Sequence, residues 1–164
     1  MQAETESQGL GGLDGHVSTP IDDKGRVIFP KAMREALGED FVIRKGTGLC
    51  LEAIRKEDYA AEVARVNEMP ESVWKNQWLR MLRGTAFSRM NADPQGRVVV
   101  PQILRVMQKF VDRVILVGIG EKVELWNPED WHKWLQDARH GEESAIYWDD
   151  VSRKMRLAGD PVSA

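Results

Sequence analysis

The sequence predicts an α+β fold in which two copies of one strand-rich unit pair into a single barrel-like β core with peripheral helices. The first observation is an internal repeat, because the stretch IDDKGRVIFP at residues 21–30 has a close counterpart in NADPQGRVVVP at residues 91–101. The second is that short apolar strands and short helices follow in the same order in both copies. The third is size, since a unit of about 45 residues rarely folds alone.

Each copy begins with a tight turn, Asp-Asp-Lys-Gly in the first copy and Asp-Pro-Gln-Gly in the second. Aspartate at the first position and glycine at the fourth are typical of a type I turn. The glycine can adopt a positive φ and start a bulge into the next strand. We therefore predict that Asp22, Gly25, Asp93 and Gly96 brace the two turns.

The apolar patterns after each turn predict a strand, a short helix and then a hairpin of two strands. The predicted strands lie at residues 27–29, 41–44, 49–54, 98–100, 114–118 and 123–126, and the short helices at 31–37 and 102–110. Pro20 lies where a strand should precede the first turn. Because proline cannot donate to a ladder, we expect that strand at a sheet edge or broken there.

Further helices are expected at residues 56–69 and 72–84, where apolar residues recur at helical spacing, and from Pro128 to Gly141. Tryptophans at Trp74 and Trp78, and again at Trp131 and Trp134, are spaced to share one helix face. Such stripes usually indicate burial, so we expect these rings to pack within the chain or between subunits.

These patterns divide the chain into five predicted segments. They are a flexible N-terminal arm at 1–12, a first repeat at 13–59, a helical connector at 60–85, a second repeat at 86–131, and a C-terminal helix and tail at 132–164. The arm is rich in Gly, Glu and Gln, which is typical of a segment that does not pack.

Composition argues against several classes of protein. No apolar run approaches the roughly 20 residues that span a bilayer, and the polar N-terminus has no secretory signal. Cys50, the single cysteine, lies in the apolar stretch LCL, which predicts a buried thiol in a reducing cytoplasm. The three histidines show no metal-ligand spacing with it. We find no nucleophile arrangement, phosphate-binding loop or metal cluster, so we predict no enzyme, no cofactor, no metal and no membrane partner.

The formal net charge of −3 argues mildly against nucleic-acid binding, because such domains are often basic. Basic residues nevertheless outnumber acidic ones around the first turn, where Lys24, Arg26 and Arg34 lie. The acidic surplus lies in the N-terminal arm and near the C-terminus. The sequence therefore allows a local basic face on an acidic protein.

The two Asp-x-x-Gly-Arg turns, each followed by an apolar strand, a proline and a helix with Arg34 or Arg105, resemble the MraZ family. These are bacterial proteins with tandem SpoVT-AbrB domains. The stretch LVGIGEKVELW, from Leu116 to Trp126, is also similar to the second half of that family. The resemblance covers residues 13–139. It implies a swapped-hairpin or double-split β-barrel, and a DNA-binding transcriptional regulator that assembles into rings on the nucleoid.

The resemblance also implies which residues contact DNA. The family's contacts centre on the basic residues of the Asp-x-x-x-Arg motif, which here are Arg26 and its neighbour Lys24, with Arg97 in the second copy. The spacing by itself favours a structural role, because the aspartate four residues earlier in each copy can pair with the arginine. Arg34 is included as a phosphate contact, with a solvated or Glu35-paired side chain as the alternative.

We therefore predict a sequence-specific DNA-binding transcriptional regulator, cytoplasmic and nucleoid-associated. Its expected targets are its own promoter and the adjacent division and cell-wall genes. Its expected partners are double-stranded DNA with short direct repeats and further copies of itself in a ring-shaped homo-oligomer. The alternative is an assembly protein whose duplicated barrel serves oligomerisation without binding DNA.

Overall fold

The computed structural model describes residues 13–139 and 141–159 of the chain. The chain divides into two compact units, Met1–Pro128 and Glu129–Ala164, and each is described here by itself. The predicted N-terminal arm lies outside the described residues. Within the described ranges, no helix is both long enough and apolar enough to cross a membrane.

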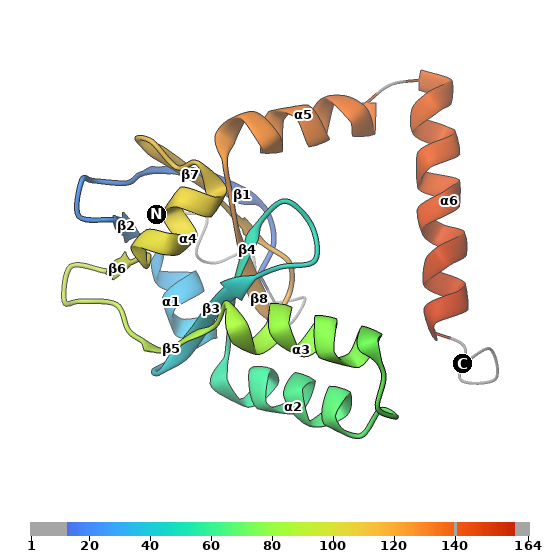
Figure 1. The fold of residues 1–164 in the computed structure, drawn as a ribbon. Helices are drawn as coiled ribbons and strands as arrows, with labels where there is room; N and C mark the ends of the chain where they lie inside the picture. The colour runs from blue at the N-terminus through green and yellow to red at the C-terminus, as the bar shows by residue number, and fades with distance from the viewer. Residues whose placement is uncertain (1–12, 140, 160–164) are drawn as a thin grey trace. The chain divides into compact units, whose positions relative to one another are not determined.

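The first unit combines short strands with short helices (Figure 1), which confirms the α+β class. Its strands are β1 (His16–Pro20), β2 (Arg26–Ile28), β3 (Phe41–Lys45), β4 (Leu51–Ile54), β5 (Phe87–Met90), β6 (Arg97–Val99), β7 (Arg113–Gly118) and β8 (Lys122–Trp126). Its helices are α1 (Lys31–Leu37), α2 (Lys56–Asn67), α3 (Val73–Gly84) and α4 (Gln102–Gln108). The elements that follow each turn have the predicted order, whereas β5, which precedes the second turn, is a strand that the sequence did not predict.

The two repeats exchange strands. All strand pairs are antiparallel, and the larger sheet has the order β1-β7-β8-β4-β3-β5. The strand that precedes each turn therefore pairs with the hairpin of the other repeat, β1 with β7 and β5 with β3. β1 lies at a sheet edge, as predicted from the proline at its end.

The strand pairings form two open sheets, so the prediction of a closed barrel is not met in the described part of the chain. β2 and β6 form a separate two-stranded ribbon, which meets the segment before it through a bridge between Ile21 and Val27 and through a hydrogen bond from the hydroxyl of Thr19 to the carbonyl of Ile28 (3.1 Å). Pro30 and Pro101 follow soon after the two strands. Proline has no N–H to offer a ladder, which limits the ribbon to three residues on each side.

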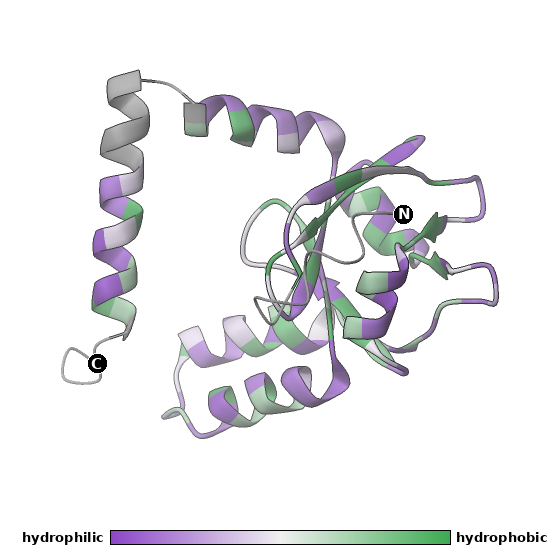
Figure 2. Cartoon of the chain, turned by 180° about the vertical axis from the view of Figure 1, so that it is seen from behind, coloured by the Kyte–Doolittle hydropathy of each residue, from purple (hydrophilic) through white to green (hydrophobic). Residues whose placement is uncertain are grey.

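The core lies between the ribbon, the short helices and one face of the larger sheet. Along β2 and just beyond it, Val27 and Phe29 are fully buried, whereas Ile28 between them is 49% exposed. This alternation is the period of two that a half-buried strand requires. The central strands of the sheet are largely hydrophobic (Figure 2). The buried core comprises Leu13, Ile21, Val27, Phe29, Met33, Leu37, Phe41, Ile43, Leu51, Ala53, Val98, Val100, Leu104, Val114, Leu116, Val123 and Leu125.

Two glutamates lie opposite each other where the repeats meet, Glu52 on β4 and Glu124 on β8. Like charges in this position are destabilising unless they are compensated. Glu52 pairs with Arg44 (Nη1 to Oε2, 2.7 Å) and with Lys122 (Nζ to Oε1, 3.2 Å). Glu124 instead accepts a hydrogen bond from the thiol of Cys50 (3.3 Å). Burial, reinforced by the charge of Glu124, raises the pKa of this thiol above its ordinary range, which agrees with an unreactive, buried cysteine.

The second unit contains α5 (Pro128–Arg139) and α6 (Gly141–Gly159). The rings of Trp131 and Trp134 stack with their centroids 5.2 Å apart, as their spacing predicts. Trp148 on α6 meets Trp134 edge-on at 6.0 Å. Aromatic contacts therefore join the two helices of this unit.

We expect Phe29→Ala to lower the free energy of unfolding by about 3–5 kcal/mol, because it leaves a cavity in the core beside Phe41, whose ring centroid lies 6.3 Å away. The neighbouring substitution Ile28→Ala should lower it by less than about 1 kcal/mol, because that side chain points outward. Urea unfolding at one fixed protein concentration measures both. Equal losses would mean that the ribbon does not pack as described.

Candidate nucleic-acid interface

The first turn is held by the aspartate that opens it. Its backbone oxygen accepts a hydrogen bond from the N–H of Gly25 (3.0 Å), which closes the turn. Oδ1 of Asp22 accepts from the backbone N–H groups of Lys24 (3.0 Å) and Arg26 (2.9 Å). Oδ2 accepts from Nε of Arg26 at 2.5 Å. One carboxylate therefore fixes both the backbone of the turn and the guanidinium at its end.

The second turn repeats this geometry. Asp93 accepts the N–H of Gly96 at its backbone oxygen (2.9 Å), and the N–H groups of Gln95 and Arg97 at Oδ1 (both 2.9 Å). Nε of Arg97 donates to Oδ2 at 2.7 Å. The repeated sequence thus encodes a repeated hydrogen-bond pattern, and the predicted bracing by the aspartates and glycines is present in both copies.

Both aspartates stay ionised at neutral pH. The backbone N–H of the arginine four residues later holds the pKa of Asp22, and likewise that of Asp93, below its usual value, and the guanidinium lowers the pKa further. The carboxylate–guanidinium pairs therefore persist over the physiological pH range.

Each turn is also braced by an arginine from the other repeat. Gly25 has a φ of +80°, and a Cβ built there would lie 2.6 Å from Nε of Arg105 on α4. Gly96 has a φ of +81°, and its Cβ would lie 3.1 Å from the guanidinium carbon of Arg34 on α1. The positive φ therefore favours glycine at both turns, and the close approach of the guanidinium adds a steric reason that is stronger at Gly25 than at Gly96.

The two bracing arginines are anchored on backbone oxygens. Nε of Arg34 donates to the carbonyl of Phe29, and Nε of Arg105 to the carbonyl of Val100, each at 3.0 Å. The amides of Phe29 and Val100 in turn donate to the glycine carbonyls of the opposite turns, at 2.9 and 2.8 Å. Arg34 therefore has a structural role that the sequence did not reveal. The signal for it is that Arg34 and Arg105 occupy equivalent places in the repeat.

The structure brings the predicted DNA-contacting residues together. The loops that carry the two turns project side by side from one end of the first unit in both views (Figures 1 and 2). Lys24 is exposed, while Arg26 and Arg97 are half-buried. The hydrogen bond of Arg26 to Asp22 uses Nε. Its two terminal amino groups have no hydrogen-bond acceptor among the residues that the structure describes.

A hollow of about 200 Å³ lies beside the first turn. Asp22 contributes to its lining from the turn, and Arg105 and Lys109 contribute from the end of α4. The sequence did not single out Lys109, which follows α4 and lies far from the turn along the chain. The first turn therefore has basic groups from both repeats around it.

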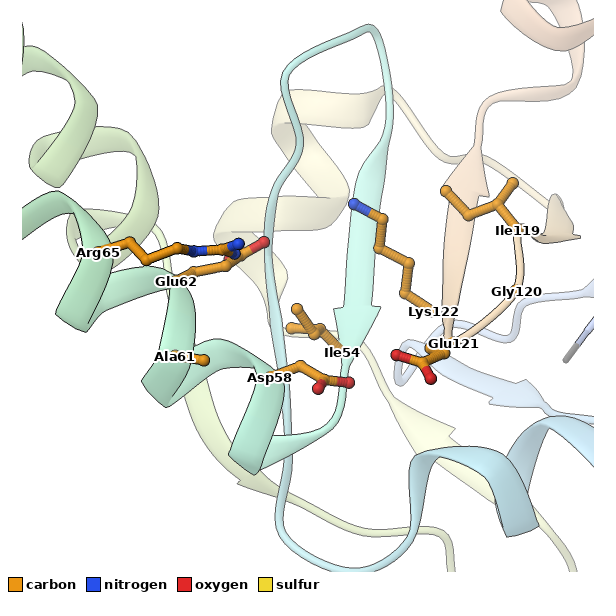
Figure 3. Close-up of a pocket in the computed structure, with 9 residues that line it drawn as sticks. All are labelled: Ile54, Asp58, Ala61, Glu62, Arg65, Ile119, Gly120, Glu121 and Lys122. Carbon is orange, nitrogen blue, oxygen red and sulfur yellow. The ribbon is translucent and has the colours of Figure 1, made fainter. Parts of the chain in front are cut away.

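A second hollow, of about 570 Å³, lies between α2 and the turn that joins β7 to β8 (Figure 3). Its charged lining residues are largely paired with basic or acidic neighbours, as with Asp58, which accepts from Nε of Arg55 at 2.8 Å. The lining residues are Ile54, Asp58, Ala61, Glu62, Arg65, Ile119, Gly120, Glu121 and Lys122. Within the described ranges, no group of three or more His, Cys, Asp or Glu residues is placed to hold a metal ion.

Comparison with known protein families identifies the chain. A family model described as "MraZ protein, putative antitoxin-like" matches residues 13–77 and again residues 81–146. The chain belongs to the MraZ family. The two matches also confirm the tandem repeat that the turns predict, and the open, strand-exchanged sheets are the form in which this MraZ chain combines its repeats.

Several curated MraZ proteins are similar over most of their length. The chain is 33% identical to Transcriptional regulator MraZ of Carboxydothermus hydrogenoformans over 144 residues, which is 86% of this chain and 94% of the relative. It is 33% identical to the protein of the same name from Thermoanaerobacter sp. over 149 residues, 85% of this chain and 99% of the relative. The corresponding protein of Caldicellulosiruptor saccharolyticus is 31% identical over 148 residues, 90% and 99% of the two chains. These names describe transcriptional regulators and no enzyme, as the sequence predicts.

We expect Gly25→Ala to lower the free energy of unfolding by about 1–3 kcal/mol, because it combines a strained φ with a clash against Arg105. Gly15→Ala is the matched control, since Gly15 also has a φ of +80° but has no atom within 4 Å of the added Cβ. Chemical denaturation of both variants separates the energetic cost of the positive φ from that of the steric clash with Arg105. A loss at Gly25 no larger than the loss at Gly15 would contradict the close approach of Arg105.

The lowered pKa values of the two turn aspartates predict an acid dependence of stability. The stabilisation that their charge provides should be fully present above the ordinary aspartate pKa of 3.8 and be lost as the pH falls through the lower folded-state values. A variant with Asp22→Asn and Asp93→Asn keeps one acceptor oxygen in each turn for the backbone N–H groups, and it loses the charge and the oxygen that accepts from the arginine. It should be less stable than the wild type at pH 7, and the difference should narrow below about pH 4. Unfolding measured from pH 7 to pH 3 tests this, and a difference independent of pH would contradict it.

Proposed function

We propose that this chain is a sequence-specific DNA-binding transcriptional regulator that contacts DNA through its two arginine-bearing turns. The observation that carries the proposal is the identical, cross-braced geometry of the turns at one end of the first unit. A guanidinium that is already fixed loses little conformational freedom on binding. Its terminal amino groups suit the paired acceptors of a phosphate or of a guanine edge. The names of the similar MraZ proteins support the regulatory class.

The proposal gives different roles to the predicted site residues. Arg26 and the exposed Lys24 make the main contacts from the first turn. Arg97 contributes from the second turn, where Gln95 replaces the lysine. Arg34 braces the second turn and adds positive charge beside it, so its contribution to phosphate binding accompanies its structural role.

One subunit offers few cations and carries a formal net charge of −3, so a single subunit should bind DNA weakly. We propose a ring-shaped homo-oligomer that presents many turns, which raises affinity through effective concentration. The expected sites are short direct repeats spaced by about one helical turn, roughly 10 bp. The expected targets are the chain's own promoter and the adjacent division and cell-wall genes, read by a cytoplasmic, nucleoid-associated protein. The strand exchange supports the swapped-hairpin fold, with repeats at 13–59 and 86–131.

One observation favours the alternative of an assembly protein without DNA binding. The aspartate–arginine pair in each turn is complete within the chain, so bracing alone could account for both residue types. The negative net charge points the same way. The two functions differ in what removal of an arginine does, because a brace affects folding or assembly while a DNA contact affects affinity.

We expect Arg26→Ala to weaken binding to the DNA upstream of the chain's own gene. The affinity of each subunit's contact should fall by about 10-fold or more. Arg65→Ala, which makes the same charge change at an exposed site on α2, is the matched control and should bind as the wild type does. Gel-shift titrations at two salt concentrations measure affinity, which should fall steeply with salt.

Size-exclusion chromatography with light scattering and an unfolding curve serve as the folding control for these variants. An unchanged oligomer with lost DNA binding supports contact by Arg26. A well-folded wild-type protein that gives no shift at low salt would refute the autoregulatory function. A variant that loses its oligomer or its fold along with DNA binding would favour the assembly function.

A further inference from the structure

The two repeats differ on the exposed faces of their equivalent helices. Large apolar side chains that are 43% to 85% exposed lie on the outer face of α4 and just beyond its C-terminal end. We call these residues the α4 patch: Ile103, Val106, Met107 and Val111. When Arg105 is set against Arg34, the equivalent residues of the first repeat are Ala32, Glu35, Ala36 and Asp40. Since the first repeat forms the same helix without large apolar residues there, folding alone does not require the α4 patch.

A second exposed apolar surface lies at the corner where α2 meets α3. The α2–α3 patch consists of Met69, Val73, Trp74 and Trp78, which are 53%, 73%, 81% and 45% exposed. Trp74 does not pack within the chain, so of the two predicted environments only packing between subunits stays a prediction for it. A groove of about 560 Å³ runs along this corner between the two tryptophans and Pro70. Large exposed apolar surfaces of this kind mark interaction sites, and tryptophan often dominates binding energy at their centre.

The corner is held in place by hydrogen bonds, so the groove is a formed feature. Oγ of Ser72 caps α3 by accepting from the backbone N–H of Lys75 at 3.0 Å. Nζ of Lys75 donates to the carbonyls of Asn67 (3.0 Å) and Met69 (2.9 Å), and it pairs with Glu71 at 2.8 Å. The side chain of Lys75 is only 9% exposed. A pre-formed groove requires little ordering when a partner binds.

We propose that the α4 patch of one copy of the chain docks into the α2–α3 groove of the next copy. This inference rests on the proposed function for the existence of the oligomer and assigns the surfaces that build it. The two patches differ in composition, and the elements that carry them, α4 and the α2–α3 pair, lie apart on the first unit (Figures 1 and 2). A contact between two different surfaces of one chain is heterologous, and such contacts build rings when their rotation closes.

The charges of the two surfaces support a second copy of this chain, and not an unrelated protein, as the partner that fills the groove. Residues 102–111, which carry the α4 patch, include Arg105 and Lys109 and no acidic residue. The corner of α2 and α3 carries Glu68, Glu71 and Lys75; Glu71 and Lys75 pair with each other, so Glu68 gives the corner its acidic balance. A basic apolar surface therefore meets an acidic apolar one, which favours association in one orientation.

The test uses two variants that each damage one surface. The first, Ile103→Ala with Val106→Glu and Met107→Ala, installs the residues that the first repeat carries at the equivalent positions. The second is Val73→Ser with Trp74→Ser. All five side chains are exposed, so both variants should keep the wild-type circular dichroism and unfolding transition. Leu49→Ala, at a residue 60% exposed outside both patches, is the matched control.

Size-exclusion chromatography with light scattering should give an oligomer for the wild type and for the control, and a monomer for each variant alone. An equimolar mixture of the two variants should give a heterodimer, because each pair retains one intact α4 patch and one intact groove. On DNA with several repeats, the second variant, whose substitutions lie on α3, should lose about 100-fold or more in affinity relative to the wild type, while its affinity per subunit for a single-site duplex stays within twofold of that of the wild type.

Variants that keep the wild-type size would overturn the surface assignment and leave the proposed oligomer standing. Variants that form dimers alone and no heterodimer when mixed would show that each patch pairs with itself, which also overturns it. If the second variant keeps the oligomer size of the wild type but binds DNA more weakly, Trp74 contacts DNA and not another subunit, which also overturns the assignment. A monomeric wild type would refute the oligomer of the proposed function itself.

Discussion

The fold depends on one close approach, in which the arginine of each repeat's short helix lies against the glycine of the other repeat's turn. A side chain at Gly25 or Gly96 would meet this guanidinium, so the two glycines and the two arginines constrain one another. The same exchange appears in the sheet, where β1 and β5 each pair with the hairpin of the other repeat. Each repeat closes its own turn, but the packing against that turn and the pairing of its first strand come from the other repeat.

The two turn aspartates have opposing effects on the arginines that they pair with. Each carboxylate fixes the arginine that is proposed to meet DNA, and it also offsets part of that arginine's charge. In both turns Nε makes the internal bond to the aspartate. At Arg26 the two terminal amino groups have no acceptor among the described residues, whereas one terminal amino group of Arg97 donates to Gln95 at 3.5 Å. Fixing a side chain before binding reduces the entropy lost on binding. Under the proposed function, the local arrangement of charges at the turns therefore matters more for DNA binding than the net charge of the chain.

Duplication also allows the two repeats to diverge on their surfaces while the frame stays the same. The first turn carries Lys24 where the second carries Gln95, so the basic character is concentrated in the first copy. The exposed face of α4 is apolar where that of α1 is small or acidic. Under the two proposals, the first copy contacts DNA through its turn and the second contacts another subunit through α4. The buried positions match more closely, because both repeats contribute to one core.

The sequence by itself determined the features that short-range interactions control. These are the two turns with their aspartates and glycines, the order of strands and helices after each turn, and the edge position of the strand that contains Pro20. Only the tertiary structure decided which strands pair, that the sheets stay open, and that Arg34 and Arg105 brace opposite turns. It also decided that Trp74 is exposed, because periodicity identifies an apolar stripe and does not say what covers it. Each of these depends on contacts between residues far apart in the chain, which local propensity and spacing do not specify.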